Sequence, residues 1–597
     1  MVKKTYNVSI LTIFLSGAKR CYMDKQLLRY LGKYKKDTFL TPVFIFIEAL
    51  LEVMIPFFMT SLIDDGIEKG NMAHTTRLGI LLLVFALISL VCGIFAAKYS
   101  SRASAGYAHN LRQALFHKVQ DFSFSNIDKF STASIVTRIT TDVSNIQMSF
   151  MMILRIVLRS PFMMLISLYF AFKTNAKIAL IYVAAIPVLA FVLFYITTHA
   201  HPYFRRVFQT YDKLNNVVQE NLHGIRVVKS FVRKDYEIEK FHDVSNEVYT
   251  LFKKAEKMTS FNMPSMQIII YACILLAAWF GANLITAGSM TTGELYSIIA
   301  YATMILSGLM MLSMIFVMVT ISQTSIRRVK EILNEESTIR NPESPVTEVK
   351  DGSISFENVS FSYYGTENKL CLVDANLEIK SGQTVGIIGG TGSAKSTMVQ
   401  LIPRLYDATK GSVKVGGVDV KEYDIETLRE SVAMVLQKNE LFSGTIKSNL
   451  RWGNENATDE ELIEACKLSC ADEFISKMPE GYDTRIERGG TNVSGGQKQR
   501  LCIARALLKK PKILILDDST SAVDVATESV IRAGFKRYIP ETTKIIIAQR
   551  ITSVQDADVI VVMDNGHICG IGTHDELLAS NEIYQEVYYS QQKGGKE

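Results

Sequence analysis

Six long apolar stretches in the first half of the chain limit its possible folds more than any other feature. They are Phe39–Ile63, Leu78–Ala97, Ser149–Phe172, Ile178–Thr198, Met263–Ala287 and Leu295–Ile321. A helix needs about 20 apolar residues to cross the hydrocarbon core of a membrane. Because lipid offers the backbone no hydrogen bonds, only helices and closed barrels span it. We therefore predict an all-α membrane domain of six transmembrane helices over residues 38–335.

The loops between these stretches differ in length and charge. Residues 98–145 and 199–262 form two long loops rich in Lys and Arg, whereas the other loops are short and poor in them. The positive-inside rule then places the long loops, both termini and the second half of the chain in the cytoplasm. Both long loops have helical, amphipathic patterns, so we expect the membrane helices to continue well beyond the membrane. The basic stretch Lys19–Lys36 predicts an interfacial helix within an N-terminal segment of residues 1–37.

Four ionisable residues fall within the predicted spans, where a charge is expensive and usually has a partner or a purpose. Glu48 and Glu52 lie one helical turn apart in the first span, and Arg155 and Arg159 repeat that spacing in the third. One interpretation is that they line a substrate cavity in which the glutamates favour cationic cargo. The other is structural Glu–Arg pairing between helices, or arginines that snorkel toward the inner leaflet. Both stay open, because the sequence does not fix the rotation of either helix about its axis.

The sequence changes character near residue 340. Residues 336–350 are mostly polar and include Pro342 and Pro345, which is typical of a linker. From Ile354 onward, strand patterns alternate with helical ones. This alternation predicts a cytosolic α/β domain with a largely parallel sheet over residues 351–597.

A glycine-rich loop in the second domain predicts phosphate binding. The buried-strand pattern Thr384–Ile388 runs directly into this loop and then into a helix. In such a P-loop, backbone N–H groups surround the β-phosphate, Lys395 reaches the β- and γ-phosphates, and the Ser396 hydroxyl ligates Mg²⁺. Ala394 replaces the second glycine of the pattern but keeps every backbone donor, so we expect ATP binding to survive, weakened at most. The predicted loop residues are Gly389, Gly390, Thr391, Gly392, Ser393, Ala394, Lys395, Ser396 and Thr397.

Two further motifs make nucleotide binding specific. Ile513–Asp517 is an apolar strand that ends in a carboxylate, as needed to hold the magnesium of a P-loop. Between the two motifs lies a Ser-Gly-Gly-Gln sequence, formed by Ser494, Gly495, Gly496 and Gln497. With these motifs in this order, the chain resembles a half-transporter of the ATP-binding-cassette exporter family. Asn126–Asp142 and Glu220–Phe231 are similar to the segments that dock on the ATPase domains, so the resemblance covers nearly the whole chain.

The resemblance implies roles for several residues. Tyr363 is similar to the aromatic residue that stacks on adenine, and Gln437 to the glutamine that touches Mg²⁺ and the attacking water. Ser396, Gln437 and Asp517 would then be the metal ligands, with ATP and Mg²⁺ as cofactors. Residues 494–497 look like the signature that completes the nucleotide site of a second chain. The family also implies ATP-driven transport by alternating access.

Two residues depart from the family's pattern at the catalytic position. Asp518 follows Asp517 where active members have a glutamate base, and its side chain is one methylene shorter. Gln549 stands in the place of the switch histidine; its amide can donate a hydrogen bond to a γ-phosphate but cannot titrate. Both changes spare ATP binding and impair the transition state. We therefore predict a degenerate site that mainly holds ATP, the alternative being an active site that tolerates both changes.

The intact signature beside an impaired P-loop site predicts a heterodimer with a different half-transporter chain, whose own P-loop site carries most of the hydrolysis. The expected cargo is a small amphipathic, drug-like substrate, exported across a bacterial plasma membrane in contact with its lipids. A net charge of +6 is mild for a membrane protein, so we expect no nucleic-acid partner. The competing interpretations are a lipid or peptide exporter of the same fold and an ATP-gated regulatory membrane protein.

Overall fold

The computed structural model describes residues 25–365, 369–518 and 523–593. They form two compact units, one of residues up to 120 together with 133–334, and one of residues 121–132 together with those from 335 onward. The predicted interfacial segment lies mostly outside the described residues. Its last part forms the short helix α2 (Lys25–Leu28) and the 3-10 segment η1 (Arg29–Tyr34), which is kinked at Gly32.

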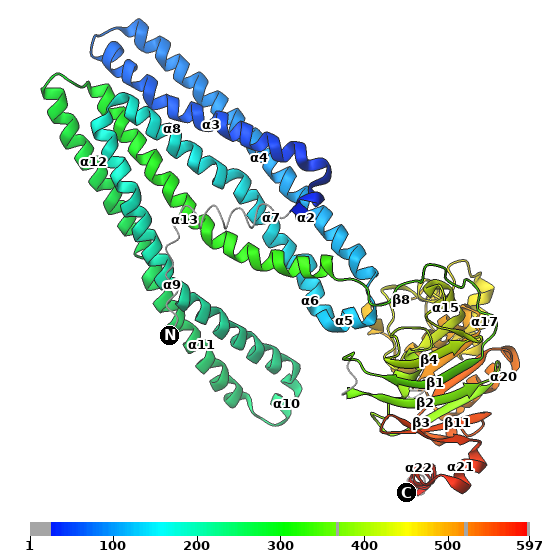
Figure 1. The fold of residues 1–597 in the computed structure, drawn as a ribbon. Helices are drawn as coiled ribbons and strands as arrows, with labels where there is room; N and C mark the ends of the chain where they lie inside the picture. Colours follow the sequence, from blue (N-terminus) through cyan, green and yellow to red (C-terminus); the bar gives the residue numbers. More distant parts are fainter. Residues whose placement is uncertain (1–24, 366–368, 519–522, 594–597) are drawn as a thin grey trace. The chain divides into compact units, whose positions relative to one another are not determined.

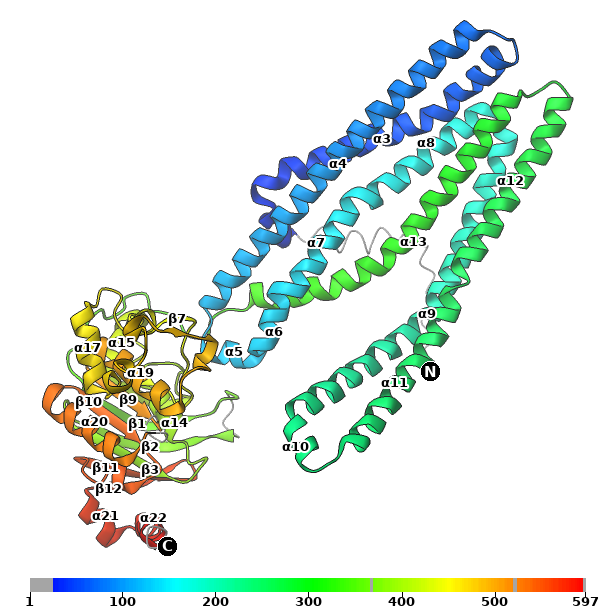
Figure 2. The ribbon, with the colours of Figure 1, turned by 180° about the vertical axis from the view of Figure 1, so that it is seen from behind.

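The first unit is all helical. Six of its helical segments are long and apolar enough to cross a membrane, a count that holds for the described residues and confirms the predicted six. Figures 1 and 2 show them running side by side along the unit. Their main helices are α3 (Lys35–Ser61), α4 (Met72–Gln120), α8 (Leu158–Thr174), α9 (Ala176–His223), α12 (Asn262–Thr286) and α13 (Thr292–Asn334).

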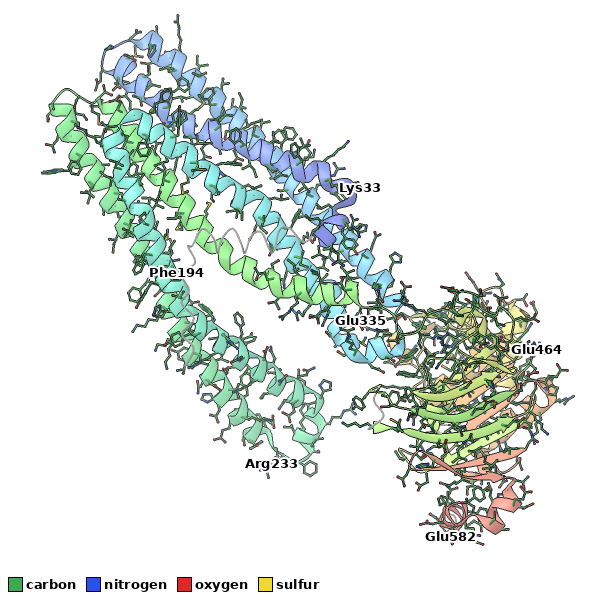
Figure 3. All side chains as sticks on the ribbon, viewed as in Figure 1. Lys33, Phe194, Arg233, Glu335, Glu464 and Glu582 are labelled. Carbon is green, nitrogen blue, oxygen red and sulfur yellow. The ribbon has the colours of Figure 1, made fainter. Side chains whose placement is uncertain are left out.

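Several helices are much longer than a membrane requires. The 49 residues of α4 and the 48 of α9 continue from apolar into polar sequence without a break in the helix. Helix α11 (Lys234–Thr259) packs against α9, and the two are joined by the short α10 (Ile225–Ser230). Figure 3 labels Arg233 at the end of this helical arm. The expectation that membrane helices extend well beyond the apolar region is confirmed.

Shorter elements lie between α4 and α8, and those from Thr132 onward belong to the third spanning segment. Helices α5 (Phe124–Phe130) and α6 (Thr132–Thr137) lead through the π-helical turn η3 (Arg138–Asp142) into α7 (Val143–Met152). A second π-helical turn, η4 (Ile153–Val157), joins α7 to α8. Helix α5 belongs by its contacts to the second unit.

The second unit is an α/β domain with two main sheets and a two-stranded pair, β7 (Gly444–Thr445) and β8 (Arg485–Ile486). The larger has the order β12-β11-β3-β10-β9-β6 and is parallel except for β12 at its edge, which confirms the predicted largely parallel sheet. Its strands are β3 (Thr384–Gly389), β6 (Val432–Val435), β9 (Ile513–Asp517), β10 (Thr543–Ile547), β11 (Val559–Asp564) and β12 (His567–Gly572). The smaller, antiparallel sheet contains β1 (Ile354–Phe361), β2 (Leu372–Ile379), β4 (Lys410–Val415) and β5 (Val418–Asp419).

Both faces of the larger sheet are covered. Along β9, Ile513 and Ile515 pack into one hydrophobic cluster while Leu514 and Leu516 pack into the other, because successive side chains of a strand point to opposite faces. A strand buried on both faces is continuously apolar, which explains the run that precedes Asp517. The main helices are α14 (Lys395–Gln400), α17 (Asp459–Leu468), α19 (Gly495–Leu508), α20 (Val525–Tyr538), α21 (His574–Ser580) and α22 (Glu582–Lys593).

Candidate functional site

The carboxyl ends of four parallel strands bring most of the predicted site residues together. Strands β3, β10, β9 and β6 are neighbours, and the register places Ile547 opposite Asp517 and Val435 opposite Leu516. The strands therefore end at one edge of the sheet, which is where ligands bind in open α/β folds. The P-loop follows β3, Asp518 follows β9, Gln549 follows β10 and Gln437 follows β6.

The P-loop has the shape of a phosphate cradle. A side chain on Gly389 would place its Cβ 2.1 Å from the Met563 carbonyl oxygen, so only glycine fits there. In contrast, a Cβ on Gly390 or Gly392 would meet nothing within 4 Å, which leaves open space beside the backbone. Gly392 and Ala394 both have left-handed backbone, with φ of 85° and 72°. Ala394 therefore adopts a conformation that suits the glycine of the pattern, at a strain of roughly 1–2 kcal/mol for an L-residue.

The Lys395 amine lies over the P-loop. Its Nζ donates to the carbonyl oxygens of Gly389 and Gly390 at 2.9 and 2.7 Å. Burial lowers the pKa of Lys395, while the carboxylates of Asp518 and Asp517 act in the opposite direction. A partly desolvated cation beside open space at the start of a helix fits the phosphates of a nucleotide.

Ser396 and Asp517 form the candidate magnesium site. The Ser396 hydroxyl donates to Asp517 Oδ1 at 2.8 Å. Burial raises the pKa of Asp517, and the hydrogen bond from Ser396 partly opposes this shift. Within the described ranges, no group of three or more His, Cys, Asp or Glu side chains could hold a metal ion. These two oxygen ligands therefore suit Mg²⁺ that arrives with a nucleotide, because Mg²⁺ is usually held by one or two protein ligands and phosphates.

Three of the predicted residues meet at one carboxylate. Asp518 is 8% exposed and has a φ of 46°. Its Oδ2 accepts hydrogen bonds from Gln549 Nε2 at 2.9 Å and from Gln437 Nε2 at 3.4 Å. The two residues that depart from the family's pattern thus bind each other, a pairing that the sequence analysis did not foresee.

Tyr363 lies beside the P-loop helix. Its hydroxyl is 3.0 Å from Thr397 Oγ1, and its ring meets the Tyr406 ring edge-on at 5.2 Å. Burial raises the pKa of its phenol, yet 44% of the residue remains exposed, leaving surface on which a base can stack.

Tyr406, which the sequence analysis missed, links this corner of the domain to α5. Its hydroxyl donates to Asp128 Oδ2 at 2.7 Å, and its ring lies 6.0 Å from that of Phe124. Helix α5 is also held by Asn126 and Lys129, whose side chains both bind Glu335. The only sequence signal for Tyr406 was an aromatic residue shortly after the P-loop helix. That it contacts the segment similar to docking regions is known from the structure.

The Ser-Gly-Gly-Gln sequence starts helix α19. Ser494 is its N-cap and forms a reciprocal capping box with Gln497, in which each side chain binds the other's backbone N–H. Ser494 and Gly495 are exposed. The local geometry therefore presents the start of a helix, with its favourable dipole for anions, on the surface of the unit.

Three of the four charged residues in the membrane helices form one cluster. Arg159 reaches Glu48 Oε1 at 3.2 Å and Glu52 Oε2 at 2.6 Å, so one guanidinium bridges both carboxylates. Arg155 is exposed and has no ion pair within the described part of the chain. These contacts correspond to helix-to-helix pairing for three of the residues, whereas Arg155 acts on Glu48 only through its charge.

A six-helix membrane unit followed by a P-loop α/β domain with this signature defines an ATP-driven membrane transporter. Residues 38–310 match the model of the ABC transporter transmembrane region, and residues 372–521 match the model named ABC transporter. The chain belongs to the ABC transporter family and is an exporter half-transporter. Its ATP-binding domain makes it an ATPase coupled to transport.

Full-length relatives support this assignment. An ABC transporter ATP-binding protein of Bacillus subtilis is 36% identical over 564 residues, which cover 94% of this chain and 98% of the relative. One from Mycobacterium tuberculosis is 34% identical, covering 91% and 94%. A putative multidrug export ATP-binding/permease protein of Staphylococcus aureus is 31% identical, covering 95% and 99%. Together with the six apolar helices, these relatives identify a multi-pass protein of the bacterial plasma membrane.

Proposed function

We propose that this half-transporter pairs with a different chain and that its own P-loop site mainly holds ATP. The observation that carries the proposal is the hydrogen bond from Gln549 to Asp518. A general base needs a carboxylate oxygen free to accept a proton from water. Here two amides donate to Asp518 Oδ2, and the side chain is one methylene shorter than glutamate. The carboxylate therefore has a shorter reach than that of a glutamate, and one of its two oxygens already accepts two hydrogen bonds.

The same site keeps the residues that the family pattern assigns to nucleotide binding, apart from Ala394. Lys395 and the loop backbone would hold the phosphates, Ser396, Asp517 and Gln437 would hold Mg²⁺, and Tyr363 would stack on the base. The negative charge of the ATP triphosphate would be balanced by Lys395 and by the N–H groups of the loop backbone. The residues that bind ATP are therefore separable from those that activate water.

Residues 494–497 would complete the nucleotide site on the partner chain. The capping box uses the backbone N–H groups of Ser494 and Gln497 and holds the helix start in shape. The dipole of this exposed helix start would favour the γ-phosphate. Hydrolysis would then occur mainly at the P-loop of the partner, and the present chain would supply a working signature to it.

Contacts of α5 would transmit the movement caused by nucleotide binding to the membrane helices. Tyr363 contacts Tyr406, and Tyr406 donates to Asp128 of α5. A movement of Tyr363 would therefore reach α5 through two contacts, and α5 continues along the chain into α6 and α7. Closure of the ATPase domains would turn the cavity from inward-facing to outward-facing.

We propose a small amphipathic compound as the cargo. The Staphylococcus aureus relative is named a putative multidrug export ATP-binding/permease protein, and the carboxylates of Glu48 and Glu52 would favour cationic cargo. We keep the prediction that Glu48, Glu52, Arg155 and Arg159 line the substrate cavity. Lipid or peptide export and ATP-gated regulation are the competing functions. They are distinguished by measuring transport into inside-out vesicles when the partner's catalytic glutamate is replaced.

The first experiment is the composition of the intact complex. The tagged chain, gently solubilised from its native host, should give a native mass equal to this chain plus an unequal second half-transporter. Peptide identification should find glutamate and histidine in that partner at the catalytic positions. A mass of twice this chain alone would contradict the proposal, because Asp518 and Gln549 would then have to support all hydrolysis.

The second experiment separates the two sites by substitution. Asp518→Ala should lower the total ATPase rate less than twofold, whereas Ser494→Arg should lower it more than tenfold. Thr458→Arg is a matched control, because Thr458 caps α17 with the same kind of capping box as Ser494. Equally severe losses for Asp518→Ala and Ser494→Arg would refute the division of labour between the sites.

A further inference from the structure

Gln591, near the end of α22, binds the backbone of the loop that carries Gln549. Its Nε2 donates to the Gln549 carbonyl oxygen at 2.8 Å, and its Oε1 accepts from the Ile551 N–H at 3.0 Å. A single planar amide therefore uses both its donor and its acceptor on backbone groups two residues apart. Such a two-point contact fixes both the position and the orientation of the loop.

Helix α22 is itself anchored in the domain core. Tyr584 is fully buried and shares a hydrophobic cluster with Ile551, and Val587 and Tyr588 pack against that cluster. Gln591 follows Tyr584 by seven residues, so these four positions form one stripe along the helix. Figure 3 marks Glu582 at the start of α22. The stripe begins in the core and ends at the loop.

The loop is held from both sides of Gln549. Its side-chain amide donates to Asp518 on the sheet edge, while its carbonyl accepts from Gln591 on α22. Gln549 and Arg550 are exposed between the end of β10 and the 3-10 turn η8 (Ile551–Ser553). The direction of the Gln549 amide therefore depends on both contacts.

We propose that Gln591 is a positioning residue that sets the Gln549 amide for recognition of the γ-phosphate. The proposal rests on the ATP-holding function of this site, and it adds that α22 determines how well the site distinguishes ATP from ADP. Without Gln591, the loop keeps its link to Asp518 and its own turn hydrogen bonds but loses the two contacts that orient the backbone at Gln549 and Ile551. ATP then binds less tightly, whereas ADP, which has no γ-phosphate, is unaffected.

The test compares ATP and ADP affinity at this chain's P-loop in the complete purified transporter. Photoaffinity labelling of this chain with an azido-ATP, competed by ATP or ADP, gives both affinities. For Gln591→Ala we expect about a fivefold loss of ATP affinity, the effect of roughly one net hydrogen bond, with unchanged ADP affinity. Gln591→Met keeps the length and helix propensity without the hydrogen bonds, and it should behave like Gln591→Ala.

The matched control is the neighbouring Gln592→Ala. The Gln592 amide donates to the Tyr588 hydroxyl within α22 and, among the described residues, does not bind the loop, so its loss should leave the ATP-to-ADP ratio as in the wild type. The Met variant also covers the case in which the alanine variant fails to fold. A wild-type ratio in both Gln591 variants, or an equal loss for ATP and ADP, would overturn the inference.

A Lys395→Ala variant separates this inference from the function on which it rests. It should abolish labelling of this chain if the P-loop holds ATP. Persistent labelling would refute the holding function itself. Loss of labelling in Lys395→Ala, together with a wild-type ATP-to-ADP ratio in the Gln591 variants, would refute only the role of Gln591.

Discussion

Replacing Arg159 with leucine tests whether the membrane charges are a structural cluster. The guanidinium serves two carboxylates, and at about 4 Å and an effective dielectric near 20 each attraction amounts to about 4 kcal/mol. Removing one partner of a buried ion pair destabilises proteins by about 3–5 kcal/mol. Because the Arg159 side chain is 36% exposed, we expect a smaller loss, about 2–3 kcal/mol. The remaining glutamates also repel each other one turn apart.

Thermal unfolding of the purified complex in one detergent measures this loss. Arg159→Leu should lower the apparent midpoint by on the order of 5 °C, whereas Arg155→Leu, one turn earlier and without an ion pair among the described residues, should change it little. Adding Glu48→Gln and Glu52→Gln to Arg159→Leu should restore most of the stability. An Arg159→Leu midpoint equal to that of Arg155→Leu would refute the argument.

Three further predictions concern the ATPase domain. Ala394→Gly removes left-handed strain and Gly392→Ala introduces it, so the two should shift the unfolding midpoint in opposite directions, upward and downward; shifts of the same sign would contradict this reasoning. Because burial lowers the pKa of Lys395, the amine loses its proton, and ATP affinity falls, before the rising pH reaches the ordinary lysine value of 10.5. An ATP affinity that stays constant up to that pH would count against this reasoning. Tyr406→Phe keeps the ring but removes the hydrogen bond to Asp128; transport per ATP hydrolysed should fall several-fold with ATP affinity unchanged, and unchanged coupling would exclude this route.

The sequence was most informative where one physical constraint acts alone. Apolar length suffices to predict six membrane helices, and the run Ile513–Leu516 predicts an apolar strand that ends in Asp517. The order of P-loop, signature and acidic strand end predicts which strand ends carry the site. All of these depend on local pattern, which is present in the chain before it folds.

Contacts that depend on the rotation of helices, or on pairing between distant segments, could not be predicted from the sequence. Whether Arg159 faces the glutamates depends on rotation of two helices about their axes, which packing decides. The hydrogen bond between Gln549 and Asp518 depends on β9 and β10 being neighbours. The left-handed backbone of Ala394 is favoured by the loop and opposed by its own side chain. The residue type alone therefore predicts a negative φ at this position. Gln591 lies in a polar helix end where nothing in the sequence indicates its partner.

The length of the helices has a mechanical consequence. At 1.5 Å per residue, α4 and α9 are each about 70 Å long, and only about 30 Å is needed within hydrocarbon. A tilt of about ten degrees at the membrane therefore displaces the far end by about 7 Å, more than one helical pitch. Pro187 and Pro202 each remove a main-chain hydrogen bond from α9 and mark where it bends most easily. A small repacking between membrane helices therefore moves the tip near Arg233 sideways by several ångströms.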